Sequence, residues 1–427
     1  MSVLQPISRA AALVSFVVLG ALTSLGAGIS IPLLSQTAAS TGRVRPITDP
    51  TQLRRLEFDD LEYTGAFRLP ATDSNGDNFS SGGGPLAFNP ARSSLFVGAR
   101  SGRVAEISIP AAVVKGSIAD LPAAEYLQPF ADPAEGRMKE VAEDGAALAG
   151  LLVHGGRLYG TGVIYYDANH TQSVSHFSRP LTLAERGATA MRRVGARGRA
   201  GLVAGYLASV PPEWQTALGG PALTGQCCIP IVGRTSWGPA AFAWDPAGMH
   251  RDGDIDASPL VYYTAEHPTL GPWDGSNPTY GGTIQMGGLA VIAGTRTALF
   301  VGRNGLGPFC YGNGTGDERQ ANRTGGDGER YCYDPSNSDK GQHAYPYRYQ
   351  MWAYDLAEWA AVRAGRRDPW SVKPYGVWPF DLPFPEAGVR VGGVAYDAAG
   401  RRLFVSQLHA DRDGFAYRAL IHVFHIP

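Results

Sequence analysis

One short pattern recurs along this chain and constrains its fold more than any other feature. It reads GPLAFNPARSSLFVGAR at 84–100, GLAVIAGTRTALFVGR at 288–303 and GVAYDAAGRRLFVSQ at 393–407. A looser copy, AGLLVHGGRLYGTG, covers 149–162. Each copy has a glycine-rich start, a short apolar stretch, a tight turn and a second apolar stretch. Short apolar runs separated by turn residues predict antiparallel hairpins repeated along the chain.

Further short strands are predicted after each hairpin. Third strands are expected at 104–109, 174–178, 350–355 and 420–426. Fourth strands are expected at 125–130, 202–209, 260–265 and 375–381. A divergent group of four strands, the first of them starting at 223, is expected between 223 and 265. The chain is therefore predicted to be all-β, with about five four-stranded sheets.

The hairpins of the LAFNP–SLFVG type resemble the inner hairpins of β-propeller blades, where small apolar strands crowd around the axis. The resemblance is to this superfold alone, covers nearly everything after residue 60, and implies no particular activity. It implies about five blades, with six or seven as the alternative because the copies are unevenly spaced. The last copy ends after its third strand, so we expect Tyr63–Leu69 to supply its outer strand and close the ring. An open sheet or sandwich is the alternative.

The N-terminus predicts export. Arg9 precedes an apolar run at 10–25, and small residues follow, so residues 1–39 are interpreted as a signal peptide. An uncleaved anchor is the alternative, because 29–34 brings the run toward the ~20 apolar residues that cross a bilayer. Either interpretation predicts a secreted, periplasmic or cell-surface protein. Polar residues 40–61 are predicted to be a linker, and 62–427 a monomeric domain without a membrane span.

Charge and motif content narrow the partners. Lys and Arg total 37 against 38 Asp and Glu, so no basic stripe is available to bind nucleic acid. We expect no metal and no cofactor, since neither zinc-type spacing nor a phosphate loop is present in the sequence. The expected partner is a glycan or another small extracellular ligand.

Four cysteines form two local pairs. Cys310 and Cys332 flank a glycine-rich stretch and are predicted to close it with a disulfide, which export would favour. Cys227 and Cys228 are adjacent, so they form either a vicinal disulfide or two thiols, and the sequence leaves both open. With Gln226 they are expected to begin an inner strand and line the channel.

The expected site is a composite one at the channel mouth, built from the long loops of one face. Those loops are predicted at 70–83, 131–147, 210–226, 266–283, 304–349, 384–390 and 408–418. The candidate catalytic residues are Glu143, Asp144, His343 and Asp411. The candidate binding residues are Tyr345, Tyr347, Arg348, Trp273, Arg412 and Gln226.

These residues predict a carbohydrate-active protein. Glycoside hydrolysis needs two carboxyl groups facing each other, and Glu143 or Asp144 with Asp411 would supply them. A uronate lyase needs a base and a cation, for which His343 or Tyr345 with Arg348, Arg303 or Arg412 would serve. The sequence does not choose between these reactions. The alternative from another class is a non-catalytic propeller that binds a ligand or glycan at the cell surface.

Overall fold

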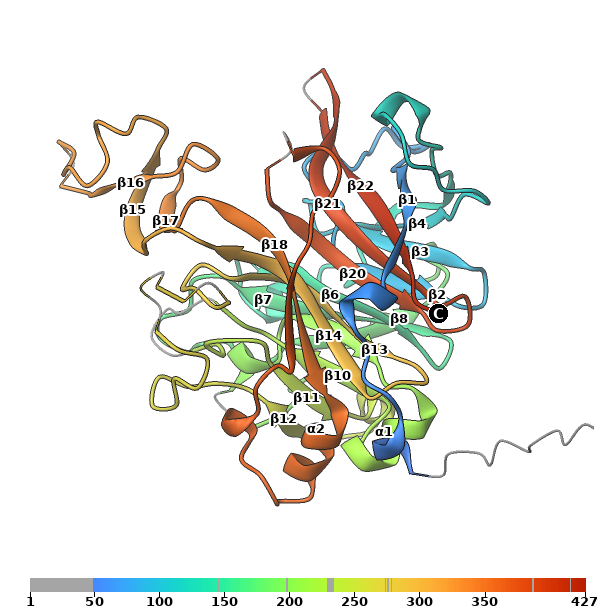
Figure 1. The fold of residues 1–427 in the computed structure, drawn as a ribbon. Coiled ribbons are helices and arrows are strands. Elements are labelled where there is room, and N and C mark those ends of the chain that lie inside the picture. Colours follow the sequence, from blue (N-terminus) through green and yellow to red (C-terminus); the bar gives the residue numbers. More distant parts are fainter. Residues whose placement is uncertain are drawn as a thin grey trace, which may run out of the picture. The chain divides into compact units, whose positions relative to one another are not determined.

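The computed structural model describes residues 49–427 except 145, 197–198, 229–233, 273, 275, 278, 327, 386–387 and 415. The predicted signal peptide lies outside this part of the chain. Most described residues in regular structure are strands of antiparallel sheets (Figure 1). No helix in the described part is long and apolar enough to cross a bilayer.

Five sheets follow one another along the described chain, and the first four pair their strands in chain order. The first comprises β2 (Leu86–Asn89), β3 (Ser94–Gly98), β4 (Val104–Ser108) and β5 (Tyr126–Ala131). The second comprises β6 (Ala146–His154), β7 (Arg157–Ile164) and β8 (His176–Pro180). The third comprises β9 (Tyr206–Ser209), β10 (Ala222–Gly225), β11 (Ala241–Trp244) and β12 (Ala257–Val261).

The last two sheets complete the set. The fourth comprises β13 (Gln285–Ile292), β14 (Thr297–Gly305), β18 (Tyr347–Asp355) and β19 (Gly376–Pro379). The fifth comprises β20 (Val391–Asp397), β21 (Arg402–Asp413), β22 (Ala416–His425) and β1 (Glu62–Arg68). A small sheet of β15 (Cys310–Thr315), β16 (Tyr331–Tyr333) and β17 (Lys340–His343) is inserted between β14 and β18.

The first strands of the five sheets pack against one another in cyclic order. β2 contacts β6, β6 contacts β9, β9 contacts β13, β13 contacts β20, and β20 contacts β2. All five also line one apolar cavity of about 320 Å³. Sheets arranged with their inner strands around a common channel define a β-propeller, as the hairpin pattern predicted.

The fifth sheet gets its outer strand from the N-terminal part of the domain. β1 pairs antiparallel with β22, with Phe67 opposite Ile421, and Phe67 is fully buried. This pairing confirms the predicted placement of Tyr63–Leu69. It also covers the hydrogen-bonding edge of β22 that would otherwise be open.

The prediction for the third sheet was wrong. The segment 202–209 was expected to be an outer strand, but β9 within it is the inner strand, and it pairs with β10. Residues 226–228 consequently follow the second strand instead of beginning the first. The tight turn seen in the other hairpins is replaced here by Pro211 and α1 (Pro212–Leu218), which hid the repeat. Residues 210–221 therefore lie at the opposite end of the channel from the one predicted.

The predicted linker is part of the folded domain from Asp49 onward. It contains two short 3-10 helices, η1 (Pro50–Gln52) and η2 (Phe58–Asp60). Between them Leu56 is fully buried; its amide donates to Thr297 Oγ1 at 2.8 Å, and its carbonyl accepts from the Tyr375 hydroxyl. A polar composition concealed this apolar anchor against the fourth sheet.

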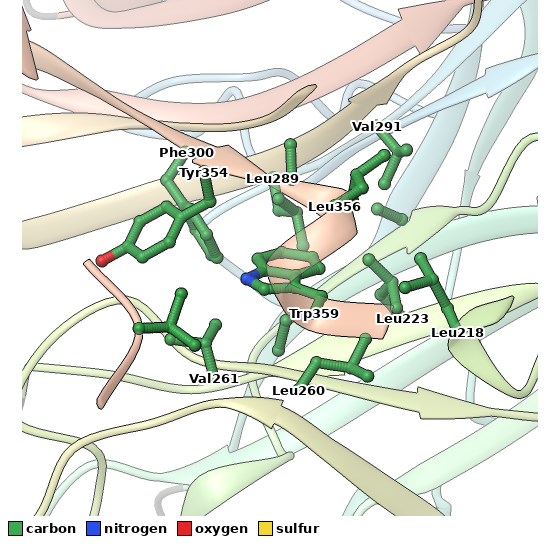
Figure 2. Packing of buried hydrophobic residues seen from close by; sticks show 14 of the residues in the cluster. Leu218, Leu223, Leu260, Val261, Leu289, Val291, Phe300, Tyr354, Leu356 and Trp359 are labelled. Carbon is green, nitrogen blue, oxygen red and sulfur yellow. The ribbon is translucent and has the colours of Figure 1, made fainter. Parts of the chain in front are cut away.

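The largest apolar cluster lies between the third and fourth sheets, where α2 (Leu356–Arg363) inserts Trp359 (Figure 2). Phe300 of β14 lies 6.1 Å from the Trp359 ring, centroid to centroid, and both are fully buried. Buried aromatic side chains of this size supply much of a core's stability. The remaining 3-10 helices are η3 (Ile118–Asp120), η4 (Arg137–Glu140), η5 (Ala200–Leu202), η7 (Pro246–His250) and η8 (Pro369–Ser371).

Candidate functional site

A polar cavity of about 580 Å³ lies at one end of the channel, which we call the mouth cavity. It is lined by residues at the start of inner strands, such as Gln285 and Val391, and at the end of second strands, such as Arg303. These positions meet because an antiparallel hairpin brings the start of its first strand beside the end of its second. Gly302 makes this possible, since a Cβ there would lie 2.1 Å from the Gln285 carbonyl oxygen.

Cations form one side of the mouth cavity. Arg303 is 6% exposed, donates from Nη1 to the Val389 carbonyl at 3.1 Å, and lies over the Tyr347 ring at 4.0 Å. Its buried Nε has no hydrogen-bond partner in the described structure. Burial lowers the pKa of this guanidinium. We call Arg303, Lys340 and Arg390 the cationic side.

The charge of the lining is unbalanced. Arg390 donates to the Ser336 carbonyl at 2.8 Å, and Lys340 forms a half-exposed ion pair with Glu329 at 2.6 Å. Asp339 is the single acidic residue among the described lining residues. Three cations against one carboxylate give the mouth an excess of positive charge, which attracts anions.

The second and third sheets contribute no charged side chain to the described lining of the mouth cavity. Tyr165 follows β7, Tyr206 begins β9, and Cys227 and Cys228 follow β10. The sulfur atoms of Cys227 and Cys228 are bonded to each other, with Cα atoms 3.7 Å apart, so the vicinal disulfide is the alternative that the structure contains. We call Tyr165, Tyr206 and this disulfide the apolar side.

Amide side chains complete the lining. They belong to Gln226, Gln285, Asn337 and Gln342. Each amide can donate and accept hydrogen bonds, as sugar hydroxyl groups require. Among the predicted site residues, Gln226, Cys227 and Cys228 line this cavity, and so does Arg303 from the predicted lyase set.

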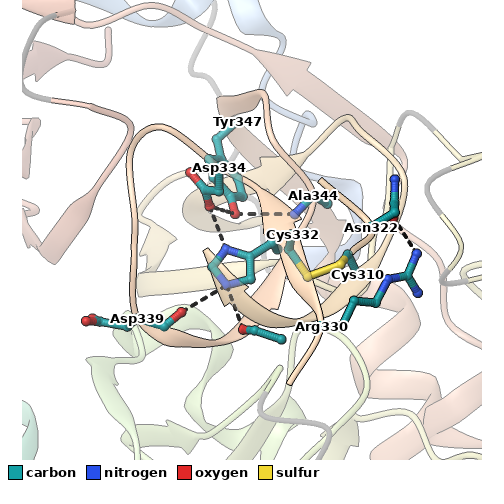
Figure 3. The surroundings of a disulfide bond; sticks show 10 residues. Cys310, Asn322, Arg330, Cys332, Asp334, Asp339, Ala344 and Tyr347 are labelled. Atoms are coloured by element: carbon teal, nitrogen blue, oxygen red, sulfur yellow. Dashed lines mark hydrogen bonds and ion pairs between the residues drawn. A yellow bond between two sulfur atoms is a disulfide. The ribbon is translucent and has the colours of Figure 1, made fainter. Parts of the chain in front are cut away.

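The predicted base His343 lies in a buried network within the inserted sheet, where it is opposite Cys310 in the pairing of β15 with β17. The Cys310–Cys332 disulfide that the sequence predicted lies in the same sheet (Figure 3). His343 is 1% exposed. Its Nδ1 lies 2.9 Å from Asp334 Oδ2, and its Nε2 faces the carbonyl oxygens of Asp339 and Gly312 at 3.0 and 3.2 Å. Since carbonyl oxygens only accept, Nε2 carries a proton.

Electrostatics hold this network in a charged state. Burial acts to raise the pKa of Asp334, but hydrogen bonds from His343, Ser336 and Tyr347 outweigh it and lower the pKa to about 2. Burial acts to lower the pKa of His343, and the bonded, charged Asp334 reverses this, so the pKa is raised. Tyr347 donates its hydroxyl to Asp334 at 2.7 Å. The network fastens the insertion, and both His343 nitrogens are occupied.

The predicted carboxylate pair is not assembled. Asp411 is 1% exposed and accepts from Arg68 at 3.1 Å and Arg418 at 3.3 Å, which makes it part of an internal ion cluster. Glu143 and Asp144 lie in an exposed turn before β6 and are not among the described residues that line the mouth cavity. The four predicted catalytic residues therefore occupy three separate environments.

The other described binding candidates are not among the residues that line the mouth cavity. Tyr345 packs on Tyr347 with ring centroids 6.2 Å apart. Arg348 donates to Gln350 at 3.1 Å, and Arg412 lies over the Tyr417 ring at 5.3 Å. Trp273 lies outside the described residues.

Sequence reasoning missed Tyr165, Lys340, Arg390 and Gln285 as site residues. A signal was present for three of them. Gln285 and Arg390 stand just before the glycine-rich starts of two repeated hairpins, and Tyr165 stands just after the second strand of another. Within the described part of the chain no three His, Cys, Asp or Glu side chains gather in a way that could hold a metal ion.

Comparisons with known proteins were made at three levels. No protein-family model matches the sequence, and no curated protein matches it either. Among solved structures, hydrazine synthase of Kuenenia stuttgartiensis is similar over 79% of this chain and 57% of its own, with 11% identity and a TM-score of 0.31. This chain thus spans little more than half of that protein's length.

A second solved structure is the β-propeller domain of Cps50 (Swd1) from Myceliophteria thermophila. The similarity covers 78% of this chain and 67% of that domain, with 6% identity and a TM-score of 0.26. Likenesses this distant concern the fold alone. The class of protein is a β-propeller, and its function has to be argued from its own residues.

Proposed function

We propose that this protein is an exported, non-catalytic β-propeller that binds an acidic glycan at the mouth cavity. The observation that carries the proposal is the charge of the lining: Arg303, a nearly buried guanidinium, and two further cations stand against a single carboxylate among the described residues. A buried cation without a full set of acceptors is costly. A ligand carboxylate or sulfate would supply those acceptors.

The rest of the lining supports a ligand rich in hydroxyl groups. Four amide side chains surround the cations and can both donate and accept. The volume of about 580 Å³ lies within the range of ~300–1,000 Å³ typical of small-molecule sites. An acidic sugar unit combines the charge and the hydroxyl groups that such a lining recognises.

Binding fits the site better than hydrolysis or elimination. Hydrolysis of a glycosidic bond needs two carboxyl groups, and Asp339 carries the single carboxyl group among the described residues that line the mouth cavity. Elimination needs an available base, and both nitrogens of His343 are engaged. Export is supported by the predicted signal peptide and by two disulfides, which persist in oxidising compartments.

Calorimetric titration of the full chain with matched acidic and neutral trisaccharides tests the proposal. We expect binding of the acidic trisaccharide, weakened by about tenfold in Arg303→Gln and in Lys340→Gln, because one ionic contact is worth about one decade of affinity. Affinity is expected to fall as salt rises. Arg319→Gln is the control, since Arg319 is 88% exposed and bonded to its neighbour Asp317.

Two results would contradict the proposal. Equal affinity for the neutral trisaccharide, or unchanged binding in both Arg303→Gln and Lys340→Gln, would contradict the proposal that the ligand is acidic. New reducing ends or unsaturated products after incubation with an acidic polysaccharide would show that the protein is catalytic and would contradict the proposal that it only binds.

A further inference from the structure

Two neighbouring tyrosines stand out on the surface beside the mouth cavity. Tyr165 is 65% exposed and Tyr166 is 68% exposed, the highest values among the exposed large hydrophobic side chains of the described chain. Both follow directly after β7. Single exposed apolar residues need no explanation, but two adjacent aromatic rings at the edge of a cavity often mark a contact surface.

The loop that carries these tyrosines is held by buried groups. Arg234 is 4% exposed and donates from Nη2 to the carbonyl of Ile164 at 2.6 Å and to that of Tyr165 at 3.0 Å. Further along, Asp167 accepts from the amide and hydroxyl of Thr171 at 2.6 and 2.7 Å.

Both ends of the loop are thus fixed before any ligand arrives. A ring presented in this way loses little conformational entropy on binding.

Of the two tyrosines, only Tyr165 lines the mouth cavity. It belongs to the second sheet, next to the third sheet that carries the vicinal disulfide and Tyr206. The cationic side comes from the fourth sheet (Arg303), the inserted sheet (Lys340) and the residue before β20 (Arg390). The cavity is therefore two-sided, with aromatic and disulfide surface on one side and guanidinium and ammonium groups on the other.

This two-sidedness matches one chemical class. A pyranose ring has an apolar face of C–H groups, which packs against the electron-rich face of an aromatic ring. A uronate pyranose carries a carboxylate at the ring's edge, where a guanidinium can bind it with two parallel hydrogen bonds. A flexible carboxylate without a ring would use the cationic side alone.

From this arrangement we infer that the ligand is a uronate-containing oligosaccharide and that Tyr165 is the residue on which its sugar ring stacks. The inference rests on the proposed function and adds the substrate class and a specificity-determining residue. Tyr166 does not line the cavity and is therefore not expected to stack on the sugar, although it has the same chemistry and a similar exposure. The pair therefore contains its own control.

The test compares two probes of equal charge, a linear triuronate and the ring-free tricarboxylate tricarballylate, by calorimetry on the full chain. We expect Tyr165→Ala to weaken triuronate binding by about tenfold, as stacked aromatic contacts are often worth a decade or more. Binding of tricarballylate is expected to be unchanged in this variant. Tyr165→Phe, which keeps the ring, and Tyr166→Ala are expected to bind both probes like the unmodified protein.

The outcomes separate the two proposals. Unchanged triuronate binding in Tyr165→Ala, with a loss in Arg303→Gln, overturns the stacking role and leaves the acidic site intact. Equal losses for both probes, or equal losses in Tyr165→Ala and Tyr166→Ala, also overturn stacking, because a disturbed loop would act on any ligand. No loss for either probe in both Arg303→Gln and Lys340→Gln overturns the proposed function itself. Thermal unfolding of each variant confirms that it is folded.

Discussion

Replacing Asp411 with alanine is expected to destabilise the domain by about 3 kcal/mol, because breaking a buried ion pair leaves a buried charge behind. Arg418 has a side chain only 6% exposed, so removing the carboxylate that accepts from it at 3.3 Å accounts for most of the effect. Arg68 is 31% exposed and stays partly hydrated, so its share is discounted to about 1 kcal/mol or less. Asp411, which lies on β21, is bonded to Arg418 of β22 and to Arg68 of β1.

Urea unfolding followed by tryptophan fluorescence measures this change. Arg251→Ala is the control, because the pair with Asp245 is 65% and 51% exposed and is expected to contribute less than about 1 kcal/mol. Acidic-glycan binding is expected to survive in Asp411→Ala. A decrease in the free energy of unfolding of less than about 1 kcal/mol would refute the argument that the buried ion cluster of Asp411 stabilises the domain. Loss of binding without loss of stability would restore Asp411 as a site residue.

Two further predictions concern the inserted sheet. The pKa of His343 is raised in the folded protein, so its contribution is complete below pH 6.5 and is lost as pH rises through the folded pKa. Urea midpoints between pH 6 and 9 are expected to fall more in the unmodified protein than in His343→Gln, and parallel curves would contradict this. Removing the disulfide with Cys310→Ser and Cys332→Ser is expected to remove about 3 kcal/mol of local stability, seen as faster proteolysis between these positions. An unchanged cleavage rate would show that the network around Asp334 holds the insertion alone.

The hairpin repeat made the fold predictable because its glycines report a packing requirement. Where inner strands and their partners approach closely, no Cβ fits: at Gly302 it would lie 2.1 Å from the Gln285 carbonyl oxygen, and at Gly98 it would lie 2.7 Å from the Gly84 carbonyl oxygen. The third sheet was mispredicted because a proline and a helix replace its tight turn. The repeat was recognised from the spacing of two short strands around a tight turn, so a hairpin with a longer connection cannot be recognised in the same way.

The site was less predictable than the fold. Gln226 and Arg303 both line the mouth cavity. The position of Arg303 follows from the hairpin pattern, whereas Gln226 was expected to begin an inner strand and instead follows the second strand of its sheet. Asp411 was not, because its role depends on register: it lies opposite Arg418 across β21 and β22, and it meets Arg68 from 343 residues away. Whether a carboxylate faces a ligand or an internal arginine depends on such distant partners, which one sequence does not display.

The pairing of β1 with β22 sets an order of events for a newly made chain. β1 is synthesised first among the strands, but its partner is synthesised last, so the fifth sheet stays incomplete until residue 425 has emerged. Contacts this far apart in sequence form slowly, and an unpaired strand invites association with other chains. During any passage across a membrane, both strand edges would need protection by a chaperone. A chain that ended before Leu420 would lack every β22 residue that pairs with β1, so completion of the fifth sheet depends on the synthesis of β22.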